Sequence, residues 1–419
     1  MSSPELVHPV PATDARDWMS TLVTTFLDNP YDEKFDKWVA RYERTWDPER
    51  TWGYRDRGRY VATLATLERV LTVPGAGGTT SDLTVDALTG VTVAATHRRR
   101  GLLSAMLGAS LTAARDRGDA LSILVAAEWP IYGRFGYALG ADSMSYSYFP
   151  KRPHAALPPP PPGRVFRVER EQLGDIAPAV FDAARRQRAG QVDRHSPWWD
   201  RRLALDGYES LEDKQPTWYV HEGPDGPDGL LAWTTRRDFE ITGRLGAIKV
   251  DEFVAANDTA YRDLWAFLAG IDVVEEILLG DRPVDEPVRW LLPDARALTP
   301  KDRYDFLWVR LLDVPAALSA RAYSTPGRVV LDVVDEDFGG FAAGRFVLDA
   351  GERDATCTPT TADPELRVSQ RALASAYLGG FPLRGRVAAD EVEELVPGAL
   401  TRADAMFTAP LAPWCQTGF

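Results

Sequence analysis

The sequence predicts a multidomain protein in which α/β units are followed by an α+β unit. The chain has 419 residues, enough for roughly two to three domains that each bury their own core. A strand, a turn, a helix and another strand follow one another over 88–126, and a strand–helix pattern recurs over 245–268. Five consecutive prolines at 158–162 separate the two patterns, as a semi-rigid linker would.

The amino-acid composition limits the kinds of function that we expect of this protein. Lysine and arginine number 48 against 61 aspartates and glutamates, and the net charge of −13 argues against non-specific nucleic-acid binding and is compatible with a cationic substrate. Such a balance is also ordinary for a soluble protein. Cys357 and Cys415 provide neither a disulfide framework nor a metal-ligand spacing, so we expect no metal. Residues 1–17 lack a signal-peptide pattern and no stretch reaches about 18 apolar residues, so we expect a cytoplasmic protein without a membrane span.

The first part of the chain predicts two helices and a hairpin. Apolar residues at helical spacing run from Trp18 to Phe26, and Asp28-Asn29-Pro30 ends that helix. A second helical pattern begins at Phe35. Alternating and β-branched residues then predict strands at 59–67 and 71–74, a glycine-rich tip at 75–80 and a central strand at 88–93.

The stretch 91–103 carries the clearest functional signal. A β-branched strand ends at 91–93, and apolar residues recur at helical spacing over 103–114. The turn between them, 98–101, holds three arginines and a glycine. The first turn of a helix offers unpaired N–H groups and a partial positive charge, while a glycine allows close backbone approach and guanidinium groups add charge-assisted hydrogen bonds. This turn therefore predicts a phosphate cradle; the alternative is a solvated basic turn.

Aromatic residues follow the next predicted strand. An apolar, partly β-branched run at 121–126 predicts the second parallel strand of a βαβ unit, and Glu128-Trp129-Pro130 ends it. A short turn or helix follows at 131–135. Tyr132 in this turn, with Phe135 and Tyr137, could simply fill the core under the sheet.

The second and third units follow the linker at 151–163. The second, 164–297, predicts strands at 165–168, 217–220, 229–235 and 245–254, and helices at 176–188 and 261–268. Its strand–helix junction, 255–258, has neither arginines nor glycine, and His195 lacks a second ligand at useful spacing, so we interpret it as structural. In the third, 298–419, a strand-like run at 306–315 leads into a helix. The pattern then becomes α+β, with strands at 328–334, 345–348 and 366–369 and helices at 371–378 and 399–407.

Three strings, in order along the chain, resemble one family. The string Arg98-x-x-Gly101-x-Leu103 resembles the pyrophosphate loop of the GCN5-related N-acetyltransferases (GNATs), although Leu103 replaces the usual final small residue. The longer string HRRRGLL at 97–103 is more similar to one branch, the enhanced intracellular survival (Eis) acetyltransferases. EWPIYGRFGY at 128–137 and PWCQTGF at 413–419 resemble the same branch.

The resemblance implies a three-domain architecture and a co-substrate. A catalytic GNAT domain would occupy 1–150, a degenerate GNAT-like domain without a cofactor loop 164–297, and a sterol-carrier-like α+β domain 298–419. Acetyl-CoA would be the co-substrate, its pantetheine arm pairing with the strand at 91–93 as an added strand does. The assembly would be a homohexamer. The residues expected to bind acetyl-CoA are Val91, Thr92, Val93, Arg98, Arg99, Arg100, Gly101, Leu102, Leu103, Ser104, Ala127 and Glu128.

The resemblance also assigns catalytic roles. Tyr132 would lie beside the CoA sulfur, where a phenol of ordinary pKa near 10 can give a proton to the departing thiolate. Phe419 would return to the first domain's active site, with its ionised α-carboxylate as general base; the alternative is a frayed terminus. Asp28 and Trp38 would hold a cationic acceptor by charge and by cation–π contact, or else cap a turn and fill the core.

We therefore predict an N-acetyltransferase that moves acetyl from acetyl-CoA to a primary amine by direct attack. The implied acceptors are polycationic: an aminoglycoside, a polyamine or a lysine side chain. Gly418 stands where an acidic residue is expected in aminoglycoside-modifying members, which argues against their substrate range. The alternative is a non-catalytic CoA- or lipid-binding regulatory protein that keeps the fold; the third domain itself reads better as a packing scaffold than as a lipid binder.

Overall fold

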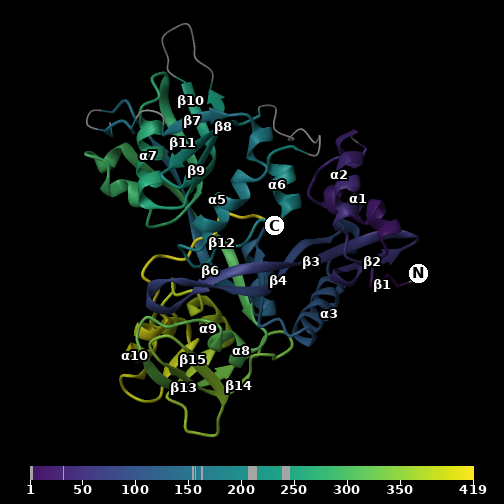
Figure 1. Cartoon of the computed structure of the whole chain (residues 1–419). Coiled ribbons are helices and arrows are strands. Elements are labelled where there is room, and N and C mark those ends of the chain that lie inside the picture. The colour runs from purple at the N-terminus through teal and green to yellow at the C-terminus, as the bar shows by residue number, and fades with distance from the viewer. Residues whose placement is uncertain are drawn as a thin grey trace.

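The computed structural model describes residues 3–31, 33–152, 155, 157–161, 164–205, 215–237 and 246–419. Five residues of the predicted linker (Pro153, His154, Ala156, Pro162 and Gly163) and Leu245 at the start of a predicted strand lie outside these residues. The described residues form a 12-stranded sheet and a separate five-stranded sheet, each packed with helices (Figure 1). None of the described helices has the length and apolar character that a membrane crossing requires.

The first unit contains the predicted strand–turn–helix–strand motif. The strands predicted at 59–67 and 71–74 are one continuous strand, because Glu68 and Arg69 continue the ladder with Asp86 and Val85. The elements are β1 (Glu5–Val7), α1 (Ala15–Thr25), α2 (Glu33–Arg44), β2 (Thr51–Asp56), β3 (Arg59–Pro74), β4 (Thr80–Val93), α3 (Leu102–Asp116), β5 (Leu121–Val125), α4 (Trp129–Tyr132) and β6 (Ala138–Tyr148).

The second unit repeats this plan. Strands β10 and β11 run parallel and are joined by α7, just as α3 joins β4 and β5. The buried side chains of Leu264, Trp265 and Leu268 hold α7 on the sheet. The elements are β7 (Val165–Val168), α5 (Ile176–Arg185), α6 (Ser196–Arg202), β8 (Thr217–Gly223), β9 (Gly226–Arg237), β10 (Gly246–Ala255), α7 (Asp258–Ala269) and β11 (Val274–Arg282).

The two units exchange their last strands. The large sheet has the order β1-β2-β3-β4-β5-β12-β6-β11-β10-β9-β8-β7. Strand β12 (Leu298–Leu311) follows the second unit in sequence but pairs with β5 of the first, while β6 of the first unit pairs with β11 of the second. Residues 298–311, which the sequence analysis assigned to the third unit, therefore lie inside the large sheet. The exchange joins both units in one continuous sheet.

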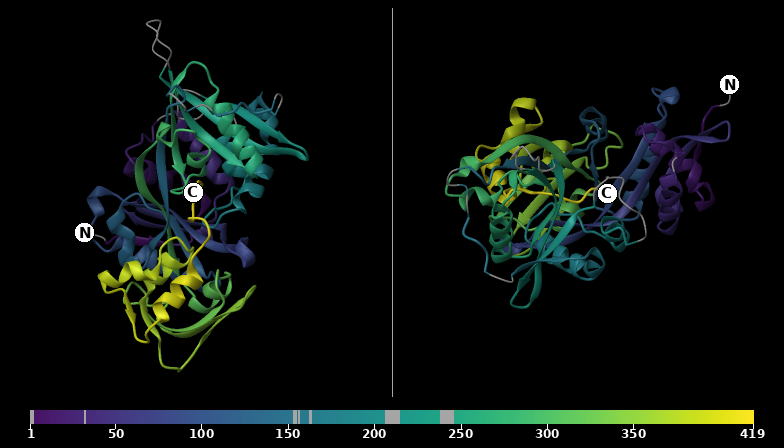
Figure 2. Two further views of the ribbon diagram at one scale, coloured as in Figure 1. Left: turned by 90° about the vertical axis from the view of Figure 1, so that its left-hand side faces the viewer. Right: turned by 90° about the horizontal axis from the view of Figure 1, so that it is seen from above.

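The third unit is a five-stranded sheet with helices, and Figure 2 shows it as a lobe of its own. One buried core joins it to the large sheet, since Leu71 and Val309 of that sheet cluster with Leu331, Tyr377 and Phe407. The elements are α8 (Val314–Ser319), β13 (Gly327–Val334), β14 (Gly344–Ala350), β15 (Ala355–Pro359), β16 (Leu366–Ser369), α9 (Gln370–Ala376), β17 (Val392–Glu394) and α10 (Ala399–Phe407).

The last segment, 408–419, contains no helix or strand and leaves the third unit. Figure 1 shows the C-terminus between the second unit and β4, far from α10 where the segment starts. The Trp414 amide donates a hydrogen bond to the Ala189 carbonyl, 3.0 Å away, and the side chain of Cys415 is buried. The end of the chain is therefore attached to the second unit and not frayed.

Candidate active site

A cavity of about 870 Å³ brings the predicted site residues together. Its walls come from α1, α2, β4, α3, the turn after β5, helix α6 of the second unit and the last residue of the chain. All the residues predicted for acetyl-CoA, catalysis and the acceptor line it: Asp28, Trp38, Val91, Thr92, Val93, Arg98, Arg99, Arg100, Gly101, Leu102, Leu103, Ser104, Ala127, Glu128, Tyr132 and Phe419.

The cavity opens where β4 and β5 diverge. The two strands pair over only three positions, Asp86 with Ser122 to Leu88 with Leu124, although β4 continues to Val93. A register shift opposite β3 and a left-handed Gly90 (φ +61°) bend β4 at this point. A Cβ on Gly90 would lie 3.0 Å from the Trp18 ring, so a larger residue does not fit without movement. Beyond Leu88, the edge of β4 that faces β5 is available to a ligand.

The turn between β4 and α3 has the features of an anion cradle. Gly101 is the N-cap of α3 in a left-handed conformation (φ +78°), and a Cβ built there would meet nothing within 4 Å. Arg99 is also left-handed (φ +63°), and the side chains of Arg98, Arg99 and Arg100 are exposed. Because Gly101 provides no capping side chain, the first N–H groups of α3 face the cradle. These features suit an anion such as a pyrophosphate.

Tyr132 lies on the opposite side of the opening. It ends α4, a single turn that starts after Glu128 with Pro130 near its N-terminus. Its side chain is largely buried, and burial, with a smaller contribution from Glu128, raises the pKa of Tyr132 to about 12. The phenol therefore keeps its proton at any physiological pH.

The neighbouring aromatic residues belong to the core. Tyr137 is fully buried, its hydroxyl lies 2.7 Å from the Ser122 hydroxyl, and Ser122 donates to Asp86 at 3.1 Å. Phe135 is 2% exposed and packs edge-on against Phe338 of the third unit. Both residues hold the Tyr132 turn in place, and Tyr132 packs edge-on against Tyr137 with 6.1 Å between ring centroids.

Helices α1 and α2 form the wall on which the sequence analysis expected the acceptor, called the acceptor wall below. Leu27 takes a left-handed conformation (φ +66°) after α1, and the Asp28 amide donates back to the Val23 carbonyl at 2.9 Å. Asp28 is exposed, and Trp38 is half-buried and packs against the core cluster that contains Trp18 and Phe35 while also lining the cavity. Leu22 and Phe26 add apolar surface to the same wall.

Matches to protein families agree with this geometry. Residues 7–140 and 190–311 each match the acetyltransferase (GNAT) domain, and residues 314–416 match the sterol carrier protein domain. A protein of Streptomyces griseus named an uncharacterized N-acetyltransferase is 36% identical over 423 residues, which cover 99% of each chain. N-acetyltransferase Eis of Mycobacterium tuberculosis is 33% identical over 372 residues, covering 86% of this chain and 85% of that protein. The crystal structure of Eis1 from Mycobacterium abscessus is similar with a TM-score of 0.84 and 29% identity, covering 100% of both chains.

The chain belongs to the Eis-type GNAT family. It is thus an acetyltransferase, and the prediction of two GNAT-like units with a sterol-carrier-like unit is confirmed. The second unit lacks the cofactor loop of the family. Only Ala256 and Asn257 separate β10 from α7, whereas eight residues, 94–101, separate β4 from α3.

Several lining residues were missed by the sequence analysis. Arg41 and Tyr42 line the acceptor wall and follow Trp38 at helical spacing on α2, so the i, i+3 and i+4 rule could have indicated them. Arg201 comes from α6 of the second unit. No local pattern near Arg201 points to a site in the first unit, because only the packing of the two units brings it there.

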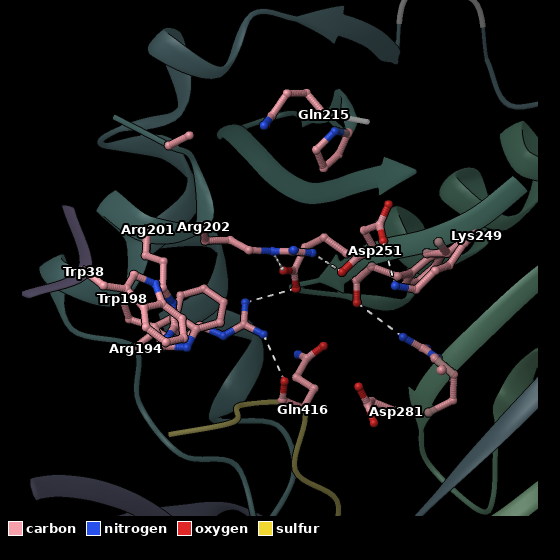
Figure 3. Close-up of a pocket in the computed structure, with 17 residues that line it drawn as sticks. Trp38, Arg194, Trp198, Arg201, Arg202, Gln215, Lys249, Asp251, Asp281 and Gln416 are labelled. Atoms are coloured by element: carbon pink, nitrogen blue, oxygen red, sulfur yellow. Dashed lines mark hydrogen bonds and ion pairs between the residues drawn. The ribbon is translucent and has the colours of Figure 1, made fainter. Parts of the chain in front are cut away.

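A second cavity, of about 490 Å³, lies beside the first in the second unit (Figure 3). Trp38 and Arg201 line both cavities. The segment that ends the chain separates them, since Gln416 lines the second cavity and Phe419 lines the first. Among the described residues, no group of three or more His, Cys, Asp or Glu side chains is arranged to hold a metal ion.

Proposed function

We propose that this Eis-type protein acetylates a primary amine of a polycationic acceptor, with Tyr132 as general acid and the Phe419 carboxylate as general base. The observation that carries the proposal is the shared cavity. An anion cradle, an open strand edge, a protonated phenol and the chain's own terminal residue all line it, together with Asp28 and Trp38. These groups come from distant parts of the sequence and have complementary uses in acyl transfer.

The reaction proceeds by direct attack. The Phe419 carboxylate accepts a proton from the acceptor ammonium, and the amine nitrogen then bonds to the thioester carbonyl carbon. The C–S bond breaks, the acetyl group stays on nitrogen, and the thiolate of CoA leaves. Tyr132 donates a hydrogen bond to that sulfur as it leaves, and the sulfur then takes a proton from solvent. The attacking nitrogen loses its second proton to solvent, and the carboxylate releases the proton that it accepted.

The raised pKa of Tyr132 defines how this acid works. An ordinary thiol has a pKa of about 8.5, so a phenol with a pKa of about 12 does not protonate a free thiolate spontaneously. Its contribution is a hydrogen bond to sulfur that strengthens as negative charge develops in the transition state. The same raised pKa keeps the donor protonated at every working pH.

Polycationic acceptors are supported by charge at the cavity. Asp28 is exposed and lines the cavity together with Trp38, and the terminal carboxylate adds a second anion. Arg41 and Arg201 line the same cavity and repel cations. An acceptor therefore gains attraction only where its ammonium groups lie nearer to the carboxylates than to these two arginines. By family resemblance the active assembly is a cytoplasmic homohexamer, and light scattering coupled to gel filtration tests its mass.

The test is CoA release from acetyl-CoA with polyamines, aminoglycosides and lysine peptides as acceptors. The intact protein is compared with one extended by a few residues after Phe419, which moves the carboxylate away. Turnover by the intact protein and not by the extended one is expected. No turnover with any amine, despite acetyl-CoA binding, would favour a CoA- or lipid-binding regulator instead.

A further inference from the structure

The last residues of the chain lie against one segment of the second unit, residues 188–198, which run from the loop after α5 into the first turn of α6. Beside the Trp414 bond to Ala189, the Thr417 hydroxyl donates to the Val192 carbonyl at 3.0 Å. Gly190 is left-handed (φ +95°), and a Cβ there would come within 2.9 Å of the Trp414 amide nitrogen. This segment therefore forms a close-fitting track for the chain terminus.

One arginine, Arg194, holds the final residues directly. Its Nε donates to the Thr417 hydroxyl at 3.2 Å and one terminal nitrogen donates to the Gln416 carbonyl at 3.3 Å (Figure 3). The indole N–H of Trp198 adds a bond to the Gly418 carbonyl at 3.1 Å. Each residue from 416 to 418 is thus held by a donor of the second unit, directly before Phe419.

The Arg194 side chain is itself held in place by an ion pair and two aromatic rings. Its other terminal nitrogen donates to Glu252 of β10 at 3.0 Å, and its guanidinium carbon lies 4.0 Å from the ring centroids of both Phe181 and Trp198. The Arg194 and Glu252 side chains are 2% and 3% exposed. Burial lowers the pKa of Arg194, whereas in Glu252 the effect of burial is outweighed by Arg194 and Arg202, which lower its pKa. A buried ion pair contributes little net stability, so its value here is in fixing geometry.

We propose that Arg194, held by Glu252 and the two aromatic rings, is a positioning residue that fixes the Phe419 carboxylate in the catalytic cavity. Arg194 lines the second cavity and touches the tail, while Phe419 lines the first. The second unit, which lacks a cofactor loop, thereby supplies the support for a group that acts in the first unit. The inference rests on the proposed function, in which that carboxylate is the base.

The experiment compares tail exposure with turnover in four variants. Arg194→Ala removes the clamp, Arg194→Lys keeps a cation, and Trp198→Phe removes the N–H to Gly418 while keeping a smaller aromatic ring beside Arg194. Arg185→Ala is the matched control, because Arg185 is also buried in the second unit and pairs with Asp82 at 2.6 Å instead of with the tail. Trp198→Phe keeps the test valid if Arg194→Ala does not fold.

The experiment measures both the release of Phe419 by a carboxypeptidase and the steady-state kinetics of acetyl transfer. A general loss of stability would not speed release and lower kcat while leaving the KM for acetyl-CoA unchanged. Carboxypeptidase A releases C-terminal aromatic residues, so mass spectrometry over time reports how firmly Phe419 is held. Steady-state kinetics give kcat and the KM for acetyl-CoA. In Arg194→Ala we expect release of Phe419 to become at least about tenfold faster and kcat to fall by a similar factor, since hydrogen bonds from a charged donor are lost. The KM for acetyl-CoA should stay unchanged, because the cradle at 98–101 is untouched.

The pattern across variants decides the outcome. Arg194→Lys and Trp198→Phe should give intermediate values in both readouts, and Arg185→Ala should match the unmodified protein after correction for any difference in Tm. Phe419 release at the unmodified rate in Arg194→Ala and Trp198→Phe would overturn the inference. So would equal effects in Arg185→Ala.

The inference and the proposed function fail in different ways. Faster release of Phe419 with unchanged kcat would uphold the clamp as a tail anchor but overturn both the base role of Phe419 and the positioning role that depends on it. Unchanged release in Arg194→Ala, together with loss of turnover in the C-terminally extended protein, would uphold the base and overturn the clamp.

Discussion

The change Tyr132→Phe tests the proposed acid with the smallest perturbation available. It removes one oxygen from a side chain that is 7% exposed and leaves the edge-on ring contact with Tyr137 intact. We expect the free energy of unfolding to change by less than about 1 kcal/mol.

The expected loss of turnover is large by comparison. A positioned general acid contributes about 10²- to 10⁴-fold, and the lower end applies here because a thiolate of pKa about 8.5 can also leave without a full proton transfer. We expect kcat to fall about 100-fold, which corresponds to about 2.7 kcal/mol of transition-state stabilisation. The KM for acetyl-CoA should stay within about twofold, because the strand edge and the anion cradle remain unchanged.

The pH dependence provides a separate check. Because burial raises the pKa of Tyr132 to about 12, the protonated donor is present below that pH and is lost only as the pH rises through it. Rates of CoA release between about pH 6 and pH 10 should therefore show the same alkaline limb in the variant and the unmodified enzyme. An alkaline limb below pH 10 that disappears in the variant would refute the reasoning.

Tyr137→Phe is the matched control for the same experiment. It deletes the hydroxyl that lies 2.7 Å from Ser122 and should cost about 1 kcal/mol of stability while leaving kcat within about twofold. Equal losses of kcat in the two variants would point to general disturbance of the α4 turn and not to an acid at Tyr132.

Three further predictions follow from the cradle, the domain contact and the second unit. Gly101→Val should raise the KM for acetyl-CoA several-fold in steady-state kinetics, because a β-branched residue is strained by about 1–3 kcal/mol at φ +78°. Asp335→Ala should lower the free energy of unfolding in urea by about 3–5 kcal/mol, because it leaves the guanidinium of Arg310, 3.7 Å away and equally buried, without its carboxylate. Isothermal titration should find one acetyl-CoA per chain despite two GNAT-like units, and two would contradict our view of the second.

Local elements of the fold were predictable because their signals are local. The helix over 399–407 agrees with α10 at both ends, and the helix pattern after Gly101 is α3, whose start a left-handed glycine marks. The strand–turn–helix motif could be identified because period-2 and period-3.6 patterns meet there at a recognisable junction. The predicted site residues share one cavity for the same reason, since three motifs carried most of them.

The strand exchange was not predictable from local patterns. Strand β12 ends in a run of six consecutive buried residues, 306–311, and no local pattern in 298–311 indicates whether its partner is β5, β6 or a strand of the third unit. Pairing is decided by which edges remain open after both units fold. In the same way, Arg201 and Arg194 reach their positions through the packing of one unit on another, which no sequence window contains.

The second unit illustrates how a fold can lose one function and support another. Asn257 is the N-cap of α7, and its side-chain oxygen accepts a hydrogen bond from the Ala260 amide. The N-cap of α3, Gly101, forms no such bond, so the first amides of α3 stay available to a ligand whereas this amide of α7 does not. The two-residue junction leaves no loop to surround a phosphate, and Asp258 places a negative charge where the first unit has arginines.

The gap where β10 and β11 diverge also differs in use from the corresponding gap between β4 and β5. Pairing of these strands ends at Val250 and Leu279, and the residues beyond, with Glu252 among them, line the second cavity instead of a pantetheine arm. Glu252 faces Arg194, and Arg194 faces the tail. A cleft of the kind that opens for a cofactor in the first unit thus holds, in the second, the ion pair to which the end of the chain is bound. If the carboxylate of Phe419 is the base, retention of a second GNAT-like unit without a cofactor loop has a physical reason, because that unit supplies the donors that hold residues 416–418 in place.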